Sequence, residues 1–396
     1  MPIPVSTNYG EKFNRRMQKK FFETSITVPI TNQDFEGELK AGGADRLTIL
    51  QFLNDVSWTA YTPGTSMSSQ KWLGDVESQL VIDQKYYYSV ELDSLEQFYS
   101  YVDDMSSNVV ENAAEKLAEQ IDAYVLGLHT EVKAGHRIGS DFNSSTGQNG
   151  INTGAATVTT GTGAVAIAQS GIGYAHEQST TSTSGGIGST TLVGRGIQFN
   201  SDGIWYKIST FTDSDTLVIT DWNDSTYTGG TRTSQDFIIE AVYPKTVSKT
   251  TIYADICDLK TKLDNDKIPK SDRWMVVPPD ITNLLIQASE LTPAIAMAYE
   301  DVVLNGTIGK VAGFKIYEST QVAGSSTKGW HILAGHKAFI TFAHAMKESR
   351  VVEAELNFAK LYQALDVYGA KVTIERRKAG AEAFWILTGR GDDCVA

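Results

Sequence analysis

Several features are scarce or missing in this 396-residue sequence. Its two cysteines, Cys257 and Cys394, are far apart and form no Cys-x-x-Cys pair, so we expect neither a disulfide framework nor a thiolate zinc site. No stretch approaches the ~18 consecutive apolar residues that a membrane-spanning helix needs. The start, MPIPVSTNYG, contains no apolar core of a secretory signal. We therefore expect a soluble protein with free thiols, made and kept in a reducing cytosol.

Positive charge is also scarce, because the formal net charge is −13. Such a chain does not bind nucleic acid through its overall charge, since phosphate contacts need clustered Lys and Arg. The exception is EKFNRRMQKKFF at residues 11–22, which carries Arg15, Arg16, Lys19 and Lys20. The pattern predicts a short basic amphipathic arm. A solvated terminal helix explains it equally well; the functional alternative is an arm that contacts DNA or a neighbouring subunit.

The periodicity of the first two thirds predicts strands, one long helix and then a β-rich region. Residues 47–90 alternate like two long strands around a turn at Pro63–Gly64. A lone hairpin is marginal in water, so we expect this one to lie on its own core or on another subunit. Residues 102–128 have the spacing of an amphipathic helix. Residues 140–245 contain short strand patterns and a hairpin signal at Asp202–Gly203, which predicts an inserted β-domain.

The last third returns to mixed helices and strands. One predicted helix carries Ile256, Leu259 and Leu263 on the same face. The apolar run WMVV predicts a buried strand that ends at two prolines. Asp280 is the expected cap of the next helix. The segments KAFITFAHAM, SRVVEAELNF and YGAKVTIERR predict strands near the C-terminus.

The glycine-rich stretch NGTIGKVAGFKIYEST, residues 305–320, resembles a phosphate-binding loop at first sight. That motif needs Gly, four residues and then Gly-Lys-Ser/Thr, whereas Gly306 and Gly309 are three apart and Val311 follows Lys310. Asn305–Gly306 suits a type I′ turn, and Gly313 suits a bulge or a close backbone approach. We therefore predict a hairpin and no phosphate site.

No other pattern predicts chemistry. His331, His336 and His344 do not have the spacing that places two imidazoles on one helix face. The acid-rich run DSDTLVITDWNDS lacks the calcium-loop spacing, although a weak cation site there stays open. Trp205–Tyr206 could stack on a sugar or form part of an ordinary β-domain core. We predict that the protein is not an enzyme and has no catalytic, cofactor-binding or metal-binding residues. The alternatives are a carbohydrate-binding adhesin, resting on the β-rich insert, and a hydrolase, resting only on scattered acids.

The order of longer motifs resembles a known family. FEGELKAGGADRLTI, SSQKWLGDVESQLVIDQKYYYSVELDSLEQ and NAAEKLAEQIDAYVLG are similar to the front half of tailed-bacteriophage major capsid proteins. RWMVVPPDITNLLI, NGTIGKVAGFKIYEST, GHKAFITFAHAM and YGAKVTIERRKAG are similar to the back half, in the same order. The resemblance covers about residues 25–140 and 246–390. No single motif is diagnostic; the ordered set is.

This resemblance implies an α+β protein with the Hong Kong ninety-seven capsid fold. The parts that it implies are an N-terminal arm (1–33), an extended β-hairpin loop (34–92), a peripheral domain with a spine helix (93–139 and 342–396), an inserted β-rich domain (140–245) and an axial domain (246–341).

The resemblance also implies a structural role without a cofactor. Copies of the chain would assemble as hexamers and pentamers into an icosahedral head shell that encloses a double-stranded DNA genome. The implied partners are other copies, a portal and packaged DNA, with a decoration protein as a further candidate and no membrane. The N-terminal region is too short to hold an internal scaffolding segment, so we expect a separate scaffolding protein. The implied location is the virion, after synthesis in the bacterial cytoplasm. No Lys–Asn crosslink can be placed.

Overall fold

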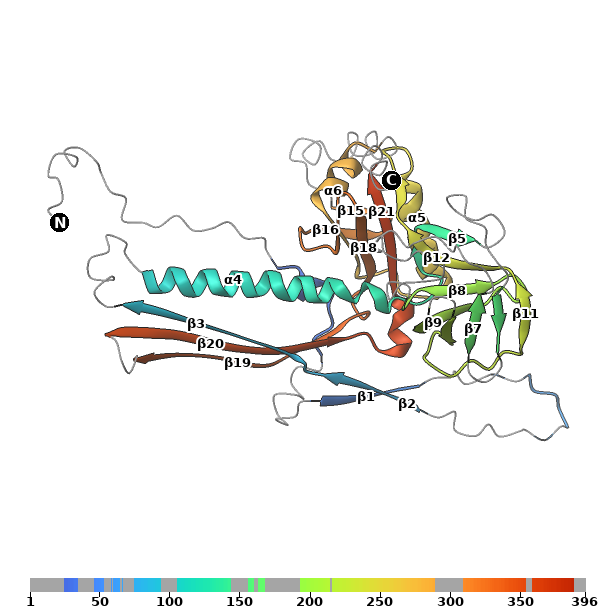
Figure 1. The fold of residues 1–396 in the computed structure, drawn as a ribbon, viewed down its shortest axis with the longest axis horizontal. Coiled ribbons are helices and arrows are strands. Elements are labelled where there is room, and N and C mark those ends of the chain that lie inside the picture. Colours follow the sequence, from blue (N-terminus) through green and yellow to red (C-terminus); the bar gives the residue numbers. More distant parts are fainter. Residues whose placement is uncertain are drawn as a thin grey trace.

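The computed structural model describes residues 25–34, 46–52, 58, 60–64, 66, 75–93, 105–143, 156–159, 163–167, 193–213, 216–288, 309–353 and 358–387. These residues form a two-stranded ribbon and three larger sheets, which we call the long sheet, the central sheet and the insert sheet. Figure 1 shows the central and insert sheets in the bulky part of the molecule and the long sheet extending away from it.

The long sheet consists of three antiparallel strands in the order β19 (Thr341–Glu353), β20 (Ala359–Lys371) and β3 (Gln84–Asp93). Helix α4 (Met105–Leu126) runs along it (Figure 1). Ile121, Val125 and Leu126 of this helix are buried in one cluster with Phe342 and Tyr368 of the sheet. The helix predicted over 102–128 is present from Met105, the described part of its apolar stripe packs into the core near its C-terminal end, and the short 3-10 helix η1 (Gly127–Glu131) continues it.

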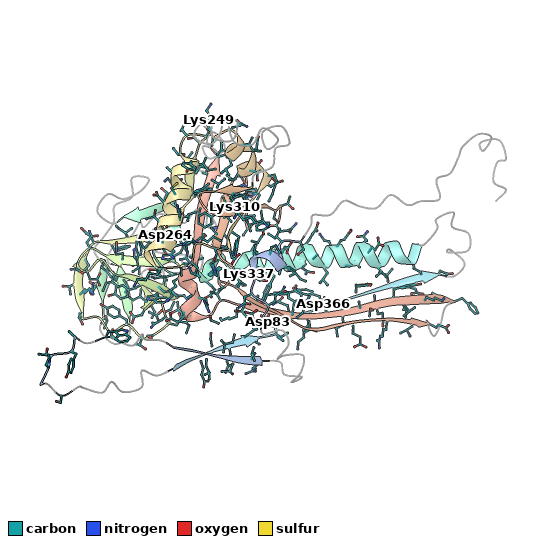
Figure 2. All side chains as sticks on the ribbon, turned by 180° about the vertical axis from the view of Figure 1, so that it is seen from behind. Asp83, Lys249, Asp264, Lys310, Lys337 and Asp366 are labelled. Carbon is teal, nitrogen blue, oxygen red and sulfur yellow. The ribbon has the colours of Figure 1, made fainter. Side chains whose placement is uncertain are left out.

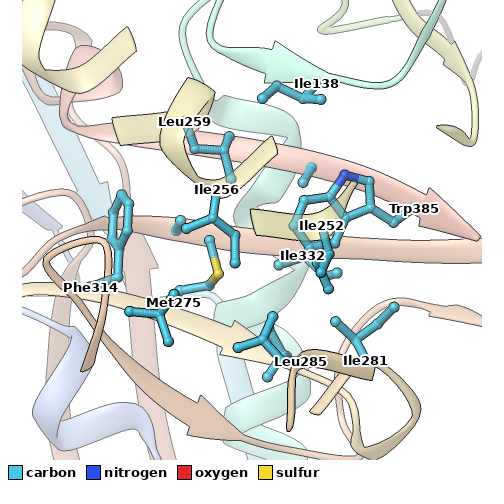
Figure 3. Close-up of a cluster of buried hydrophobic side chains, with 14 of the residues drawn as sticks. Ile138, Ile252, Ile256, Leu259, Met275, Ile281, Leu285, Phe314, Ile332 and Trp385 are labelled. Carbon is cyan, nitrogen blue, oxygen red and sulfur yellow. The ribbon is translucent and has the colours of Figure 1, made fainter. Parts of the chain in front are cut away.

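The central sheet has the order β13 (Lys245–Val247), β21 (Gly380–Leu387), β18 (Gly329–His336), β14 (Arg273–Val277), β16 (Phe314–Glu318) and β15 (Lys310–Val311). Two short strands, β4 (Arg137–Ile138) and β17 (Gly324–Ser325), pair with β21 and β18. Helices α5 (Ile252–Asn265) and α6 (Pro279–Ile286) cover the sheet and complete a core that includes Ile256, Met275 and Trp385 (Figure 3). The predicted apolar face of α5 lies in this core.

The insert sheet has eight strands in the order β11 (Arg232–Gln235), β6 (Ala156–Val158), β7 (Ala164–Ile167), β10 (Thr216–Thr220), β9 (Trp205–Asp213), β8 (Gly196–Phe199), β12 (Phe237–Tyr243) and β5 (Ser140–Asn143). Strands β8 and β9 form the hairpin predicted at Asp202–Gly203. Gly203 has φ +67°, which glycine adopts without the steric cost of a side chain. The Asp202 carboxylate accepts hydrogen bonds from the Ile204 amide and the Tyr206 hydroxyl.

The ribbon pairs β1 (Arg46–Phe52) with β2 (Asp75–Val81), antiparallel. The two-stranded prediction for residues 47–90 is confirmed for these strands but wrong for the end of the range. After Val81 the chain leaves the ribbon and continues as β3 in the long sheet. Strands β2 and β3 have the same period of two, so the alternation alone does not indicate that β3 pairs with a different strand.

Two local predictions are also wrong: the bulge or close backbone approach at Gly313, and Asp280 as the cap of the helix that follows WMVV. The described turn of the predicted hairpin joins β15 to β16 at Ala312 and Gly313, with φ +48° and +94°, as a type I′ turn requires. Gly313 is thus a turn residue, and a Cβ there would meet nothing within 4 Å; Asn305 and Gly306 lie outside the described residues. Helix α6 has Pro278 as its N-cap without a side-chain hydrogen bond, and Asp280 lies in the first turn.

The chain passes from β2 to β3 directly over strand β20. A Cβ on Gly369 of β20 would lie 2.5 Å from the Val81 carbonyl oxygen and 3.0 Å from the Ile82 Cα. Asp83, which lies between β2 and β3, accepts a hydrogen bond of 3.2 Å from the Tyr124 hydroxyl of α4. Figure 2 shows Asp83 near Asp366 of β20. Glycine at position 369 therefore allows the ribbon and the long sheet to cross closely.

We expect Gly369→Ala to lower the free energy of unfolding by about 1–3 kcal/mol, because the added methyl group overlaps backbone that cannot move aside cheaply. Urea denaturation of the unassembled subunit measures this change. Gly309→Ala is the matched control: a Cβ at Gly309 meets nothing within 4 Å, so we expect a change within about 0.5 kcal/mol. Equal effects of the two substitutions would contradict the close crossing.

Among the helices that the structure describes, none has an apolar stretch of sufficient length to cross a membrane.

Candidate functional site

The ribbon exposes large apolar side chains on a part of the molecule that has little core of its own. Its base is buried, since Ile49, Leu80 and Ile82 cluster with Ala343 of β19. Beyond the base, Leu50 of β1 is 62% exposed, and in the segment that joins the two strands and closes the ribbon Trp58 is 99% exposed and Tyr61 69% exposed. Figure 1 shows the ribbon below the bulky part of the molecule. A surface of this kind is typical of a contact with another protein.

The long sheet carries a second exposed apolar surface. Tyr87 on β3 and Val352 on β19 are exposed on one face of the sheet, and Phe358 before β20 is also exposed, whereas the exposed Val351 lies on the opposite face. These positions lie along strands that extend beyond the central and insert sheets (Figure 1). The two exposed surfaces are therefore on the two extensions of the molecule, and not on its compact part.

The four basic residues predicted to contact DNA or a neighbour, Arg15, Arg16, Lys19 and Lys20, lie outside the described residues. The first described residue, Ser25, lies next to helix α4. There the buried Asp122 carboxylate accepts hydrogen bonds from the Ser25 hydroxyl and from the amides of Ile26 and Thr27. Asp122 thus fixes the start of the short helix α1 (Thr27–Ile30) to the side of α4.

A buried polar group, which we call the Glu382 cluster, joins the central sheet to the insert sheet. Its members are His129 of η1, Arg137 of β4, Arg195 before β8, Glu240 of β12, His331 of β18 and Glu382 of β21. Arg137 lies between the two carboxylates: its Nε is 2.8 Å from Glu382 Oε2 and its Nη1 is 2.9 Å from Glu240 Oε1. Both ion pairs are almost completely removed from solvent.

Burial alone would raise the pKa of Glu382. The nearby charge of Arg195, with hydrogen bonds from His129 and His331, instead holds this pKa well below its usual value. The Glu382 side chain is therefore an ionised acceptor, and its partners are donors. The cluster holds ionised side chains in the interior, and the carboxylates of Glu240 and Glu382 each accept hydrogen bonds from donors of the protein.

Three members of the cluster have the residue types of a metal site, because ligand atoms of His129, His331 and Glu382 lie within 4.8 Å of one another. Their orientation does not fit. The two imidazole rings are stacked 4.4 Å apart at 15°, and an ion bound by a histidine lies in the plane of its ring. Two nearly parallel planes separated in this way share no ion position, and the neighbouring guanidinium groups of Arg137 and Arg195 repel a cation.

A second set of ion pairs ties the insert sheet and η1 to the C-terminal region. Arg377, in helix η3 (Ile374–Ala379), pairs with Glu131 and with Asp224, both at 2.7 Å. Close by, Asp266 is 2.5 Å from Lys133 Nζ and 3.1 Å from His136 Nε2. Burial opposes ionisation of Asp266, but hydrogen bonds from His136 and Lys133 lower its pKa to about 2.

The lowered pKa of Asp266 predicts that the free energy of unfolding depends on pH in acid. Because the folded-state pKa of Asp266 is below its unfolded value, its contribution to stability is fully present above about pH 4 and is lost as the pH falls toward about 2. We expect the difference in unfolding free energy between the wild type and Asp266→Asn to be constant above pH 4 and to shrink below it. Urea denaturation from about pH 2 to 5 measures this difference. A difference that does not change with pH would contradict it.

The structure separates the histidines that stand near one another in sequence. His331 joins His129 in the Glu382 cluster, whereas His336 accepts a hydrogen bond from the Ala338 amide and His344 pairs with Asp366. Trp205 and Tyr206 do not form an exposed platform, because Tyr206 is buried and the Trp205 ring lies against Gly135. The observation that suggested sugar binding is thus accounted for by packing.

Sequence reasoning missed the Glu382 cluster, although one signal for it exists. Glu382 is the one charged residue in the strand GAEAFWIL, and a lone carboxylate in a buried strand needs a buried partner. The partners themselves could not be named, since His129 and Arg137 are about 250 residues away in the chain.

No family model and no curated protein matches the sequence. Solved structures do match over nearly the whole chain. One, titled Mycobacterium phage Che8, has a TM-score of 0.57 at 14% identity and covers 98% of this chain and 100% of its own. The capsid of cyanophage Pam1 gives 0.56 at 11% identity, covering 98% and 99%. The capsid of cyanophage P-SCSP1u gives 0.55 at 13% identity, covering 98% and 96%. The chain has the fold of phage capsid proteins.

The α+β capsid fold that the order of motifs predicted is therefore confirmed. In this capsid fold, the ribbon and the long sheet with α4 are the extensions described above, and the central sheet with α5 and α6 is the compact part (Figure 1). The fold match spans 98% of this chain in each case.

Proposed function

We propose that this chain is a phage major capsid protein, which assembles as hexamers and pentamers into the icosahedral head shell around a double-stranded DNA genome. The observation that carries the proposal is the match to capsid structures across almost the full length of both chains. The exposed apolar surfaces of the ribbon and the long sheet support it. They suit contacts that recur between identical copies, and repeated heterologous contacts close into a shell when symmetry permits.

The role that we propose is structural, without catalysis. The boundaries inferred from the resemblance belong to the same proposal: N-terminal arm 1–33, extended loop 34–92, peripheral domain 93–139 and 342–396, insert 140–245 and axial domain 246–341. A separate scaffolding protein and a portal are the proposed assembly partners, and the virion is the proposed location after synthesis in the host cytoplasm. Arg15, Arg16, Lys19 and Lys20 are proposed to contact packaged DNA or the adjacent capsomer.

Negative-stain electron microscopy of the full chain, expressed with and without its neighbouring phage genes, tests the proposal. Closed shells or tubes in either preparation are the expected result. Small oligomers of uniform size in both preparations would overturn it. The carbohydrate-binding alternative would then be tested by glycan binding, although no described surface of the insert sheet now favours it.

A further inference from the structure

One carboxylate oxygen has three partners at the junction between the insert sheet and the central sheet. Oε1 of Glu382 lies 3.1 Å from His129 Nδ1, 2.8 Å from His331 Nδ1 and 3.4 Å from Arg195 Nη1. Arg195 belongs to the segment that enters β8, so the insert sheet is held through this contact. The next residue, Gly196, donates its amide to Glu240 Oε1 at 2.8 Å within the insert sheet, and Glu240 in turn pairs with Arg137 of β4 across the junction.

Two histidines share this oxygen in an arrangement that fixes their protonation. Because Glu382 is ionised, each ring donates from a protonated Nδ1, and a neutral imidazole then has no proton on Nε2. Any further proton must bind at Nε2. The rings of His129 and His331 are stacked 4.4 Å apart, so two such protons would place like charges face to face in the interior.

The cluster has access to solvent through a cavity. Its volume is about 350 Å³, and its walls include both histidines, Arg137, Arg195 and Glu382. Protons can therefore reach the rings without global unfolding of the chain.

The charges around the histidines balance only while the rings are neutral. The guanidinium groups of Arg137 and Arg195 face the carboxylates of Glu240 and Glu382. Among the described residues of the adjoining elements, further charged groups pair with one another: Glu131 and Asp224 with Arg377, Asp224 with Lys207, and Lys133 and His136 with Asp266; His336, on the same strand as His331, accepts a hydrogen bond from the Ala338 amide. One added proton gives this set of described groups a net positive charge, and burial lowers the pKa of His129, although Glu382 partly offsets this.

We propose that the Glu382 cluster is a pH-sensitive latch, in which proton uptake by His129 and His331 in mild acid loosens the attachment of the insert sheet to the central sheet. The direction of this pH effect follows from the linkage between proton binding and the stability of the closed junction. Because the pKa of His129 is lowered in the closed state, His129 binds a proton more strongly once the junction opens, so the closed state loses stability as the pH falls below about 6.5. Release of Arg195 from Glu382 frees the start of β8.

Amide hydrogen exchange of the full chain tests the latch, assembled or not. The reporters are the amide of Gly135, which donates to Glu240 across the junction, and the amide of Gly196, which donates to Glu240 within the insert sheet and reports on the start of β8. Exchange is measured at about pH 7.5 and 5.5 and expressed as protection factors, which removes the intrinsic pH dependence. We expect protection in segments 132–138 and 193–199 to fall about tenfold if one imidazole takes up a proton and about a hundredfold if both do.

Variants assign the effect to the two rings. Asparagine keeps an amide donor near the position of Nδ1 but does not titrate, so His129→Asn with His331→Asn should give protection that is equal at the two pH values. His336→Asn is the matched control, because it lies on the same strand outside the cluster and should keep the full response. Equal protection at both pH values in the wild type, or a response that survives in the double variant, would overturn the proposal.

Two further measurements apply if the double variant does not fold. His129→Asn alone should reduce a hundredfold response to about tenfold, or abolish a tenfold one. Deuterium exchange at the imidazole C2 position of the wild type gives the titration midpoint of His129 by mass spectrometry. A midpoint below the ordinary range supports the latch, and a midpoint at or above it overturns the latch.

Discussion

Arg137→Met lowers the free energy of unfolding of the subunit by about 3–5 kcal/mol, because it removes the guanidinium that pairs with buried Glu240 and one of the two that pair with buried Glu382. Arg137 donates to Glu382, to Glu240 and to the carbonyl oxygens of Gly194 and Thr130. Methionine fills much of the same space but supplies none of these donors. Urea denaturation of the unassembled subunit, followed by circular dichroism, measures the loss.

Lys116→Met is the control for loss of a lysine or arginine charge. Lys116 pairs with Glu119 on the surface of α4, and 71% of its side-chain surface is exposed, so we expect a loss of no more than about 0.5 kcal/mol. Adding Glu240→Gln to Arg137→Met should recover part of the stability, since the carboxylate that loses its guanidinium partner is then neutral, whereas Glu382 still pairs with Arg195. A loss below about 1 kcal/mol for Arg137→Met alone would mean that water solvates the carboxylates, contrary to their burial.

Elements with a strong local period could be predicted from the sequence. Helices α4 and α5 each bury one apolar face, which fixes their spacing at three and four residues. The hairpin of β8 and β9 follows from turn chemistry at Asp202–Gly203. In each case the signal and the structure involve the same short stretch of chain.

The prediction failed where the partner of a segment decides its role. Strands β2 and β3 have the same alternation, yet β2 pairs with β1 and β3 pairs with β20. The turn at Ala312–Gly313 was missed because alanine seldom adopts positive φ. The Glu382 cluster joins residues from widely separated parts of the chain, and no local pattern specifies which buried charge meets which.

Trp58→Ser combined with Tyr61→Ser prevents or strongly reduces shell formation while it leaves the subunit folded. Trp58 is 99% exposed and Tyr61 is 69% exposed, so the folded subunit gains little from either side chain, and we expect the free energy of unfolding to change by less than about 0.5 kcal/mol. If a neighbouring copy covers them, each contributes about 1.5–3 kcal/mol to that contact. Loss of both should then lower the equilibrium constant of each contact by at least about a hundredfold.

The yield of closed particles on a sucrose gradient, checked by negative-stain microscopy, measures this effect, and urea denaturation confirms that the subunit is folded. The matched control is Ile204→Ser, which removes an apolar side chain that is 54% exposed on the β8–β9 hairpin of the insert sheet. We expect particles of Ile204→Ser at wild-type yield, because the extensions of this fold, and not the insert sheet, carry the two apolar surfaces assigned to subunit contacts. Normal particles from Trp58→Ser with Tyr61→Ser would show that the ribbon does not form an essential contact, and the exposed residues of the long sheet would become the next surface to test.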